Sequence, residues 1–263
     1  MNNNDIKIVF VDIDWTILNH SKRPSRYDMP SIRALKKAQK KGIKVFINTA
    51  RPYHSVDQIR FFNYFKPDGL ILGNGNLVTY QDIKIFSSDI PINVFEHICE
   101  VANKNDLNLE GIRHFDCFLI NNNTKCAEKL FATYPEDMPK VEDYHHQETI
   151  GINLFAPIEY DEIIKKEVPE DYVYFRYHDY GVDIAPPPHD KGAAIKMVLE
   201  YLGLSRDNAM AIGDDIADIA MFEHVKYGIA MANGKEETIK TATHVTKHIS
   251  KHGVKHILKE LVF

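Results

Sequence analysis

Charged and hydroxyl side chains gather where the sequence predicts that a strand ends or a helix begins. They are Asp12, Asp14, Thr49, Arg51, Lys191, Asp214, Asp215 and Asp218. Carboxylates that cluster in this way repel one another unless a cation neutralises them, and a set of oxygen ligands suits Mg²⁺. An aspartate can attack phosphorus to form an aspartyl-phosphate, while Mg²⁺, a lysine and a hydroxyl group offset charge on the phosphoryl oxygens. These residue types therefore predict Mg²⁺-assisted phosphoryl transfer.

Asp12 and Asp14 follow directly on the apolar run 8–11, which is typical of a strand buried on both faces. Ligands of open α/β sheets bind at the carboxyl ends of the strands. Because side chains two residues apart in a strand share a side, both carboxylates can face one phosphorus atom. One would attack it, and the other would protonate the leaving oxygen and then activate water. The alternative is that both are ordinary carboxylates that cap a loop.

Strand and helix patterns alternate at both ends of the chain, which predicts a doubly wound parallel sheet of the α/β class. The expected strands are 8–11, 43–48, 69–72, 208–212 and 227–231, and the expected helices are 30–41, 55–65, 191–202, 216–222, 236–242 and 250–261. The expected segments of the middle region are the hairpin 77–80 and 83–86, the helices 91–103, 124–134 and 161–166, and the strands 107–112, 117–121, 150–155, 172–177 and 182–185. We therefore expect a core of residues 1–81 and 187–263, interrupted by an inserted α+β domain at 82–186.

The bulk composition is that of an ordinary soluble globular protein, with 263 residues, 44% hydrophobic and 26% charged. A formal net charge of -5 gives no general attraction to nucleic acid or to anionic membranes. The three cysteines show no CxxC spacing, which favours reduced thiols in the cytoplasm. The first residues lack the pattern of a signal peptide, and no apolar run reaches the roughly 20 residues that span a bilayer. We expect a cytoplasmic protein that binds neither nucleic acid nor membrane.

The sequence Asp12-Ile13-Asp14-Trp15-Thr16 resembles the DxDxT motif of the haloacid dehalogenase-like hydrolase superfamily. Thr49, Lys191-Gly192 and Gly213-Asp214-x-x-x-Asp218 match the second, third and fourth motifs of that superfamily in order. The inserted region is similar to the cap domain of the Cof-type subfamily. The resemblance implies a phosphatase with a Rossmann-like core and a cap that sets substrate specificity.

The resemblance also implies a role for each matching residue. Asp12 would be the nucleophile and a Mg²⁺ ligand, and Asp14 would be the general acid and base and would give its carbonyl to the metal. Thr49 and Lys191 would hold the phosphoryl group. Asp214 would complete the metal ligands. Asp218 would be a further metal ligand or would support the metal's ligands through water. Arg51 and Asn74 would contact substrate.

Three residues depart from the family pattern. Trp15 and Asp215 stand where Gly is usual, and Ala217 stands where Cof-type enzymes often have an Asn that contacts phosphate. A large indole at position 15 must point away from the phosphate or narrow the entrance to it. The loss of the Asn implies that one phosphate contact is missing or replaced.

Simpler structural roles stand beside these functional ones. Thr49 could cap a helix, while Lys191, Arg51 and Asp215 could be solvated surface residues. The histidines at 244, 248, 252 and 256 recur every four residues, but the lysines between them favour a solvated basic face over a metal site. A polar cluster in the inserted region could face substrate or form a solvated hairpin, and it comprises Arg176, His178, Asp179 and Tyr180.

The expected function is Mg²⁺-dependent hydrolysis of a small phosphorylated metabolite, such as a sugar phosphate or a similar phosphomonoester, through an aspartyl-phosphate on Asp12. Two alternatives stay open. One is a phosphomutase that uses the same intermediate, and the other is a non-catalytic phosphate-binding regulatory protein. The chain could be a monomer or a homodimer.

Overall fold

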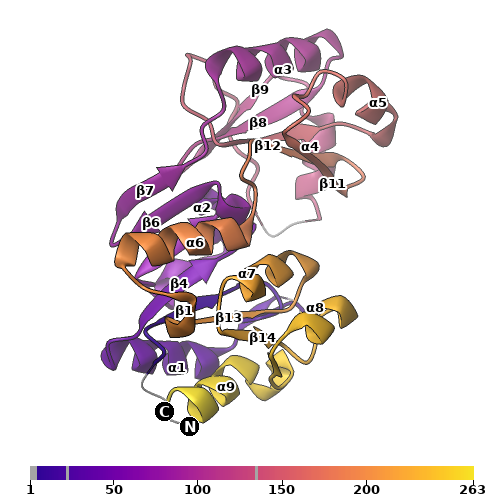
Figure 1. Cartoon of the computed structure of the whole chain (residues 1–263). Coiled ribbons are helices and arrows are strands. Elements are labelled where there is room, and N and C mark those ends of the chain that lie inside the picture. Colours follow the sequence, from indigo (N-terminus) through magenta and orange to yellow (C-terminus); the bar gives the residue numbers. More distant parts are fainter. Residues whose placement is uncertain (1–4, 22–23, 134–135) are drawn as a thin grey trace. The chain divides into compact units, whose positions relative to one another are not determined.

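The computed structural model describes residues 5–21, 24–133 and 136–263. The chain forms two compact units (Figure 1). The first comprises 1–50, 62–85 and 190–263, and the second comprises 51–61 and 86–189. The long segment of the second unit therefore spans residues 86–189, whereas the sequence predicted an inserted domain at 82–186. The short segment, 51–61, was expected in the core.

The first unit is built on a large, mostly parallel sheet with the strand order β15-β14-β13-β1-β4-β5-β6-β7. The strands are β1 (Ile8–Val11), β4 (Lys44–Asn48), β5 (Gly69–Leu72), β6 (Leu77–Tyr80), β7 (Ile83–Ser87), β13 (Ala209–Gly213), β14 (Tyr227–Ala230) and β15 (His244–Val245). Strand β1 lies between β4 and β13, parallel to both, and all four of its residues are buried. Its position explains its apolar sequence, because a central strand is covered on both faces. The predicted α/β class with a doubly wound core is confirmed, with the antiparallel pair β5 and β6 near one edge.

Helices cover both faces of this sheet. They are α1 (Met29–Lys40), α6 (Lys191–Leu202), α7 (Ile219–Glu223), α8 (Glu236–Thr241) and α9 (Gly253–Leu261). Helices α1 and α9 pack against each other on one face, and α6 and α7 pack together on the other (Figure 1). Helix α6 has strong boundaries, because Asp190 accepts hydrogen bonds from the amides of Gly192 and Ala193, and Gly203 ends the helix in the left-handed conformation.

The second unit contains an antiparallel sheet with the order β11-β12-β10-β8-β9. Its elements are α2 (Tyr53–Gln58), α3 (Ile92–Lys104), β8 (Asn108–Ile112), β9 (Cys117–Ile120), α4 (Lys125–Phe131), β10 (Gly151–Phe155), α5 (Asp161–Ile164), β11 (Val173–His178) and β12 (Gly181–Ala185). One face of the sheet packs on α3 through apolar side chains: Phe95, Ile98, Leu109, Phe118, Ile152, Leu154, Val182 and Ile184. The alternate residues of three adjacent strands, Glu110, Asn153 and Asp183, pair across the sheet and face the other way.

Several predicted helices are shorter than expected. The helix expected at 55–65 is instead α2 followed by a 3-10 turn at Phe61–Asn63, because Arg60 adopts a positive φ of 57°. His252 breaks the helix expected at 250–261 in the same way, with φ at 60°. The expected helix 124–134 ends at Phe131, and Tyr134 lies outside the described residues. The hairpin of β2 (Leu18–Asn19) and β3 (Arg26–Tyr27) was not expected, because two-residue strands carry no readable alternation.

In the part of the chain that the structure describes, every helix is too short or too polar to cross a membrane. The cysteines Cys99, Cys117 and Cys126 form no disulfide with one another.

Candidate active site

Lys191 and Asp12 form a buried ion pair at the carboxyl end of β1. The amide of Asp12 continues the sheet by donating to the carbonyl of Ile212, at 3.0 Å. Lys191 is the first residue of α6, and its Nζ donates to Asp12 Oδ1 at 2.8 Å and to Asp218 Oδ1 at 2.6 Å. Only 4% of the Lys191 side chain is exposed. The alternative of a solvated surface lysine is therefore wrong.

Asp218 holds the loop that follows β13. One of its oxygens accepts from Lys191, and the other, Oδ2, accepts from the amides of Asp214 at 2.8 Å and Asp215 at 3.0 Å. Gly213 allows this close approach, because a Cβ there would lie 2.3 Å from Asp218 Oδ2. A fully buried carboxylate thus fixes both the ammonium and the loop.

Asp214 is tied to the other loop of the site. Thr16 Oγ1 donates to Asp214 Oδ1 at 2.9 Å, and both residues are buried. This bond joins the loop after β1 to the loop after β13. The first and fourth sequence motifs are therefore held together by side chains as well as by the sheet.

The cluster carries more negative than positive charge. Burial raises the pKa of Asp12 well above its ordinary value; Lys191 opposes this shift, while Asp218, Asp14 and Asp214 add to it. Burial and the charge of Asp218 raise the pKa of Asp214 to about 7. Burial would lower the pKa of Lys191, but Asp12 and Asp218 outweigh it and raise the pKa. A divalent cation would relieve this imbalance.

The donor atoms fit such a cation. Asp12, Asp214 and Asp218 each offer one carboxylate oxygen, and these oxygens lie within 4.8 Å of one another. Oxygen donors are those that Mg²⁺ prefers. Because both oxygens of Asp218 already accept hydrogen bonds, the carboxylates of Asp12 and Asp214 are the better candidates for direct ligands.

Asp14 has a partner that the sequence did not reveal. His20 Nε2 lies 2.6 Å from Asp14 Oδ1, and His20 Nδ1 lies 2.8 Å from the hydroxyl of Ser25. The imidazole thus links the second aspartate of the motif to the β2–β3 hairpin. No spacing rule marks a histidine six residues after a strand-end aspartate, so only the structure could identify it.

Trp15 has the left-handed backbone conformation, with φ at 56°. This conformation explains why Gly is usual at this position. Trp15 is 40% exposed, and its indole lies beside the His20 ring, with 5.4 Å between ring centroids. Asn233 Nδ2 donates to the carbonyl of Trp15 at 2.8 Å. The indole therefore borders the contact between Asp14 and His20.

Thr49 and Asn74 come together at the ends of β4 and β5. The amide of Asn74, a residue with φ at 53°, donates to the carbonyl of Thr49 at 3.1 Å. Asn48, just before Thr49, is fully buried, and its Nδ2 donates to the carbonyl of Lys191 at 3.1 Å. Asn48 was not among the predicted residues, although a polar residue that ends an apolar strand was a signal for it.

Arg51 groups with the second unit. Its guanidinium pairs with Glu136 and donates to Ser55 Oγ at 2.7 Å. A substrate-binding role for Arg51 stays a prediction. Asp215 is exposed and accepts from the amide of Ile216, which is a structural cap.

The other predicted clusters have local partners. Arg176 pairs with Asp161 and donates to the carbonyls of Ala156 and His178, so this guanidinium holds the β11–β12 hairpin in place. The four histidines near the carboxyl end have separate neighbours, namely Thr243 for His244, Ser250 for His248, Asp28 for His252 and Glu260 for His256. Among the described residues these histidines form no group of metal-ligating atoms.

A family model described as haloacid dehalogenase-like hydrolase matches residues 9–258. The chain belongs to this family. YkrA, a candidate phosphatase of Bacillus subtilis (strain 168), is 28% identical over 98% of both chains. Phosphoglycolate phosphatase 1 of Saccharolobus solfataricus is 24% identical over 92% of this chain and 89% of its own.

Two solved structures share the fold of this chain. A protein from Geobacillus kaustophilus superposes with a TM-score of 0.89, at 26% identity over 97% of this chain and 98% of its own. The subclass IIB sugar phosphatase BT4131 superposes with a TM-score of 0.75, at 24% identity over the same shares. The predicted family, and the predicted class of enzyme, a hydrolase of the phosphatase type, are confirmed.

Proposed function

We propose that this haloacid dehalogenase-like hydrolase is a Mg²⁺-dependent phosphatase that acts on a small phosphorylated metabolite through an aspartyl-phosphate on Asp12. The observation that carries the proposal is the buried contact of Asp12 with Lys191, beside Asp214 at the end of the central strand. A carboxylate in this position has an ammonium next to it that can offset phosphoryl charge.

Three side chains would share the first half of the reaction. A carboxylate oxygen of Asp12 attacks phosphorus, and the bond from phosphorus to the ester oxygen breaks. Asp14 gives its proton to the leaving oxygen, and His20, 2.6 Å from Asp14, keeps that carboxyl group in one orientation. Lys191 stabilises the charge on the transferring phosphoryl group. Thr49, at the end of the neighbouring strand β4, would help to hold that group.

In the second half, Asp14 takes a proton from a water molecule, and the water oxygen attacks phosphorus. The bond between Asp12 and phosphorus breaks, and inorganic phosphate leaves with the carboxylate restored. Mg²⁺, when bound by the carboxylates of Asp12 and Asp214 and the carbonyl of Asp14, would supply positive charge at the phosphoryl oxygens. Asp218 would act through Lys191 and through the loop that carries Asp214.

The names of two similar proteins suggest a class of substrate. One relative is named a phosphoglycolate phosphatase, and one structural neighbour is named a sugar phosphatase. We propose a small phosphomonoester such as a sugar phosphate or a phosphorylated acid. Phosphate release from a panel of sugar phosphates, phosphorylated acids and nucleotides would identify it.

Asp12→Asn tests the proposal. It keeps the shape of the side chain but removes the nucleophile, so we expect Mg²⁺-dependent hydrolysis of p-nitrophenyl phosphate to fall by at least about 10³-fold. Asp215→Asn makes the same chemical change on an exposed residue of the site's loop and should keep the wild-type rate. Wild-type activity in Asp12→Asn would disprove the nucleophile assignment.

Two further measurements separate the alternatives. Transfer of phosphate to a second hexose phosphate, without release, would indicate a phosphomutase. Tight binding of phosphate analogues without turnover of any substrate in the panel would indicate a regulatory protein.

A further inference from the structure

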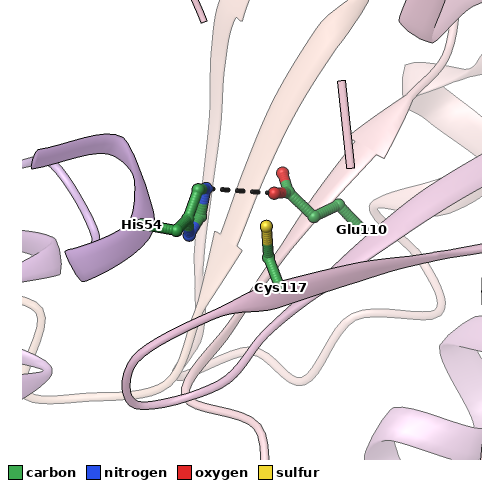
Figure 2. A group of neighbouring side chains, drawn as sticks. All are labelled: His54, Glu110 and Cys117. Atoms are coloured by element: carbon green, nitrogen blue, oxygen red, sulfur yellow. Dashed lines mark ion pairs between the residues drawn. The ribbon is translucent and has the colours of Figure 1, made fainter. Parts of the chain in front are cut away.

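A second cluster of potential metal ligands lies in the second unit. It consists of His54 on α2, Glu110 on β8 and Cys117 on β9, whose side chains converge from three elements (Figure 2). His54 Nε2 lies 3.2 Å from Glu110 Oε1, and one ligand atom of each residue lies within 4.8 Å of the other two. The cluster uses residues that play no part in the proposed phosphatase reaction.

The sheet orients the carboxylate of this cluster. Glu110 is 1% exposed and faces away from the apolar side of the sheet. Asn153, its partner across β8 and β10, donates from Nδ2 to Glu110 Oε2 at 2.7 Å. The second oxygen, Oε1, is thereby turned toward His54. Carboxylates that bind metals are commonly oriented by a hydrogen bond of this kind.

Two atoms of the cluster are buried without a hydrogen bond. Among residues 5–21, 24–133 and 136–263, neither Glu110 Oε1 nor His54 Nδ1 has a hydrogen-bond partner. Buried polar atoms without a hydrogen bond are uncommon because desolvating them costs free energy, and the 3.2 Å contact of Glu110 Oε1 with His54 Nε2 is an ion pair without hydrogen-bond geometry. A bound cation would satisfy Oε1 and draw the imidazole into its coordination sphere.

The charge state of Glu110 agrees with this geometry. Burial would raise the pKa of Glu110, but His54, Asn153 and Cys117 outweigh it and hold the pKa below its ordinary value. The carboxylate is therefore an anion near neutral pH. Burial and the charge of Glu110 raise the pKa of Cys117, so a metal would have to displace the thiol proton.

We propose that His54, Glu110 and Cys117 hold a second divalent cation of the zinc type. Imidazole nitrogen, carboxylate oxygen and thiolate sulfur are the ligands that Zn²⁺ takes in proteins, whereas Mg²⁺ does not select sulfur. Binding releases the proton of Cys117 to solvent, and the sulfur electron pair bonds to the metal. The ion joins α2 to β8 and β9, and so fixes the helix that follows Thr49-Ala50-Arg51 in the chain.

Co²⁺ titration of the full-length, chelator-treated protein tests the proposal. Co²⁺ bound to a thiolate gives a charge-transfer band in the near ultraviolet, while the oxygen ligands of Asp12 and Asp214 give none. We expect this band to saturate at one Co²⁺ per chain and to disappear when Zn²⁺ is added. The readout is independent of phosphatase activity.

Four variants test the proposed site. Cys117→Ser should abolish the band, while Cys126→Ser, a matched change at another cysteine, should keep it. Asn153→Ala should weaken Zn²⁺ binding by about 10–100-fold, because it removes the bond that orients Glu110. Glu110→Gln should weaken it further.

The opposite results would overturn the proposal. A wild-type protein without the band, or a band that persists in Cys117→Ser, would show that the three side chains only contact one another. Thermal unfolding of metal-free Cys117→Ser should match that of metal-free wild type, so that loss of the band cannot come from misfolding.

Discussion

Lys191 and Asp218 in the first unit are closely surrounded by hydrogen-bond partners, whereas His54 and Glu110 in the second unit are not. Lys191 donates to two carboxylates, and both oxygens of Asp218 accept hydrogen bonds. In the second unit, Asn153 satisfies one oxygen of Glu110, and the other has no hydrogen bond among the described residues. The first cluster is held in shape by the protein and has excess negative charge, while the second is incompletely hydrogen-bonded.

This difference predicts that the two clusters respond to different metals. The first should take a cation that needs only oxygen ligands, and the second should take one that also binds nitrogen and sulfur. Each response can be removed without the other, because the ligands come from separate compact units.

The largest expected effect follows from removing the cation of the first cluster. Chelation, or Asp214→Asn, should lower the phosphatase rate by at least about 10²-fold, because the charge at the phosphoryl oxygens is then less well offset. Mg²⁺ at 100 times its Kd should stabilise the wild type by about 2.7 kcal/mol, and Asp214→Asn should lose this gain. Steady-state kinetics and thermal unfolding with and without Mg²⁺ measure both effects.

Asp214→Asn should leave the Co²⁺–thiolate band unchanged, and Cys117→Ser should leave the Mg²⁺ response unchanged. Asp215→Asn serves as the control for a lost carboxylate in the same loop. If Asp214→Asn removed the thiolate band, the two clusters would not be independent.

A smaller loss of activity is expected for Asp218→Asn. The amide can still accept from the two loop amides, but it no longer places a negative charge beside Lys191. We expect kcat to fall by about 10-fold through misplacement of the ammonium, and the free energy of unfolding to fall by about 1–3 kcal/mol. A changed KM with an unchanged kcat would contradict a role through Lys191.

The sequence predicted the first cluster well because its residues stand at readable places. Apolar runs located β1 and β13, and the polarity switch at their ends located Asp12 and Asp214. Parallel strands bring such ends to one edge of a sheet, so distant residues could be expected together. The resemblance of the four motifs to the family added a proposed role for each residue.

The second cluster could not be predicted in this way. His54 is far in sequence from Glu110 and Cys117, and neither helical nor strand periodicity relates them. Its assembly depends on the packing of α2, which the sequence expected to be longer and to lie in the core. His20 and Asn48 escaped prediction for a similar reason, since their hydrogen bonds to Asp14 and Lys191 exist only in the folded chain.

Asp161, another carboxylate of the second unit, has hydrogen-bond donors at both of its oxygens, and these donors lower its pKa. Arg176 donates to both of its oxygens, Tyr174 donates to one, and these bonds hold the pKa of Asp161 below its ordinary value of 3.8. The folded state therefore binds this proton less readily than the unfolded state, so the stabilisation is present above about pH 4 and is lost as the pH falls further.

Asp161→Asn should lower the free energy of unfolding by roughly 1–3 kcal/mol at pH 7, since it removes a hydrogen-bonded charge pair. The difference from wild type should be the same at pH 5 and should shrink below pH 4. Urea unfolding at several pH values measures it, with Glu162→Gln as the exposed neighbouring control. A difference that grew toward low pH would contradict the assigned direction.

The smallest effect concerns the backbone of the first cluster, where Trp15 occupies the left-handed conformation between Asp14 and Thr16. Gly adopts this conformation without strain, Asn adopts it at a small cost, and β-branched residues resist it. The free energy of unfolding should therefore decrease from Trp15→Gly to Trp15→Asn to Trp15→Val, with about 1–3 kcal/mol between the first and the last. All three variants lose the contact with the His20 ring, so that loss cancels in the comparison. Urea unfolding measures these free energies. If the three variants had equal free energies of unfolding, the loop would relax on substitution. The tight hydrogen bonding of the first cluster would then not extend to the backbone beside Asp14.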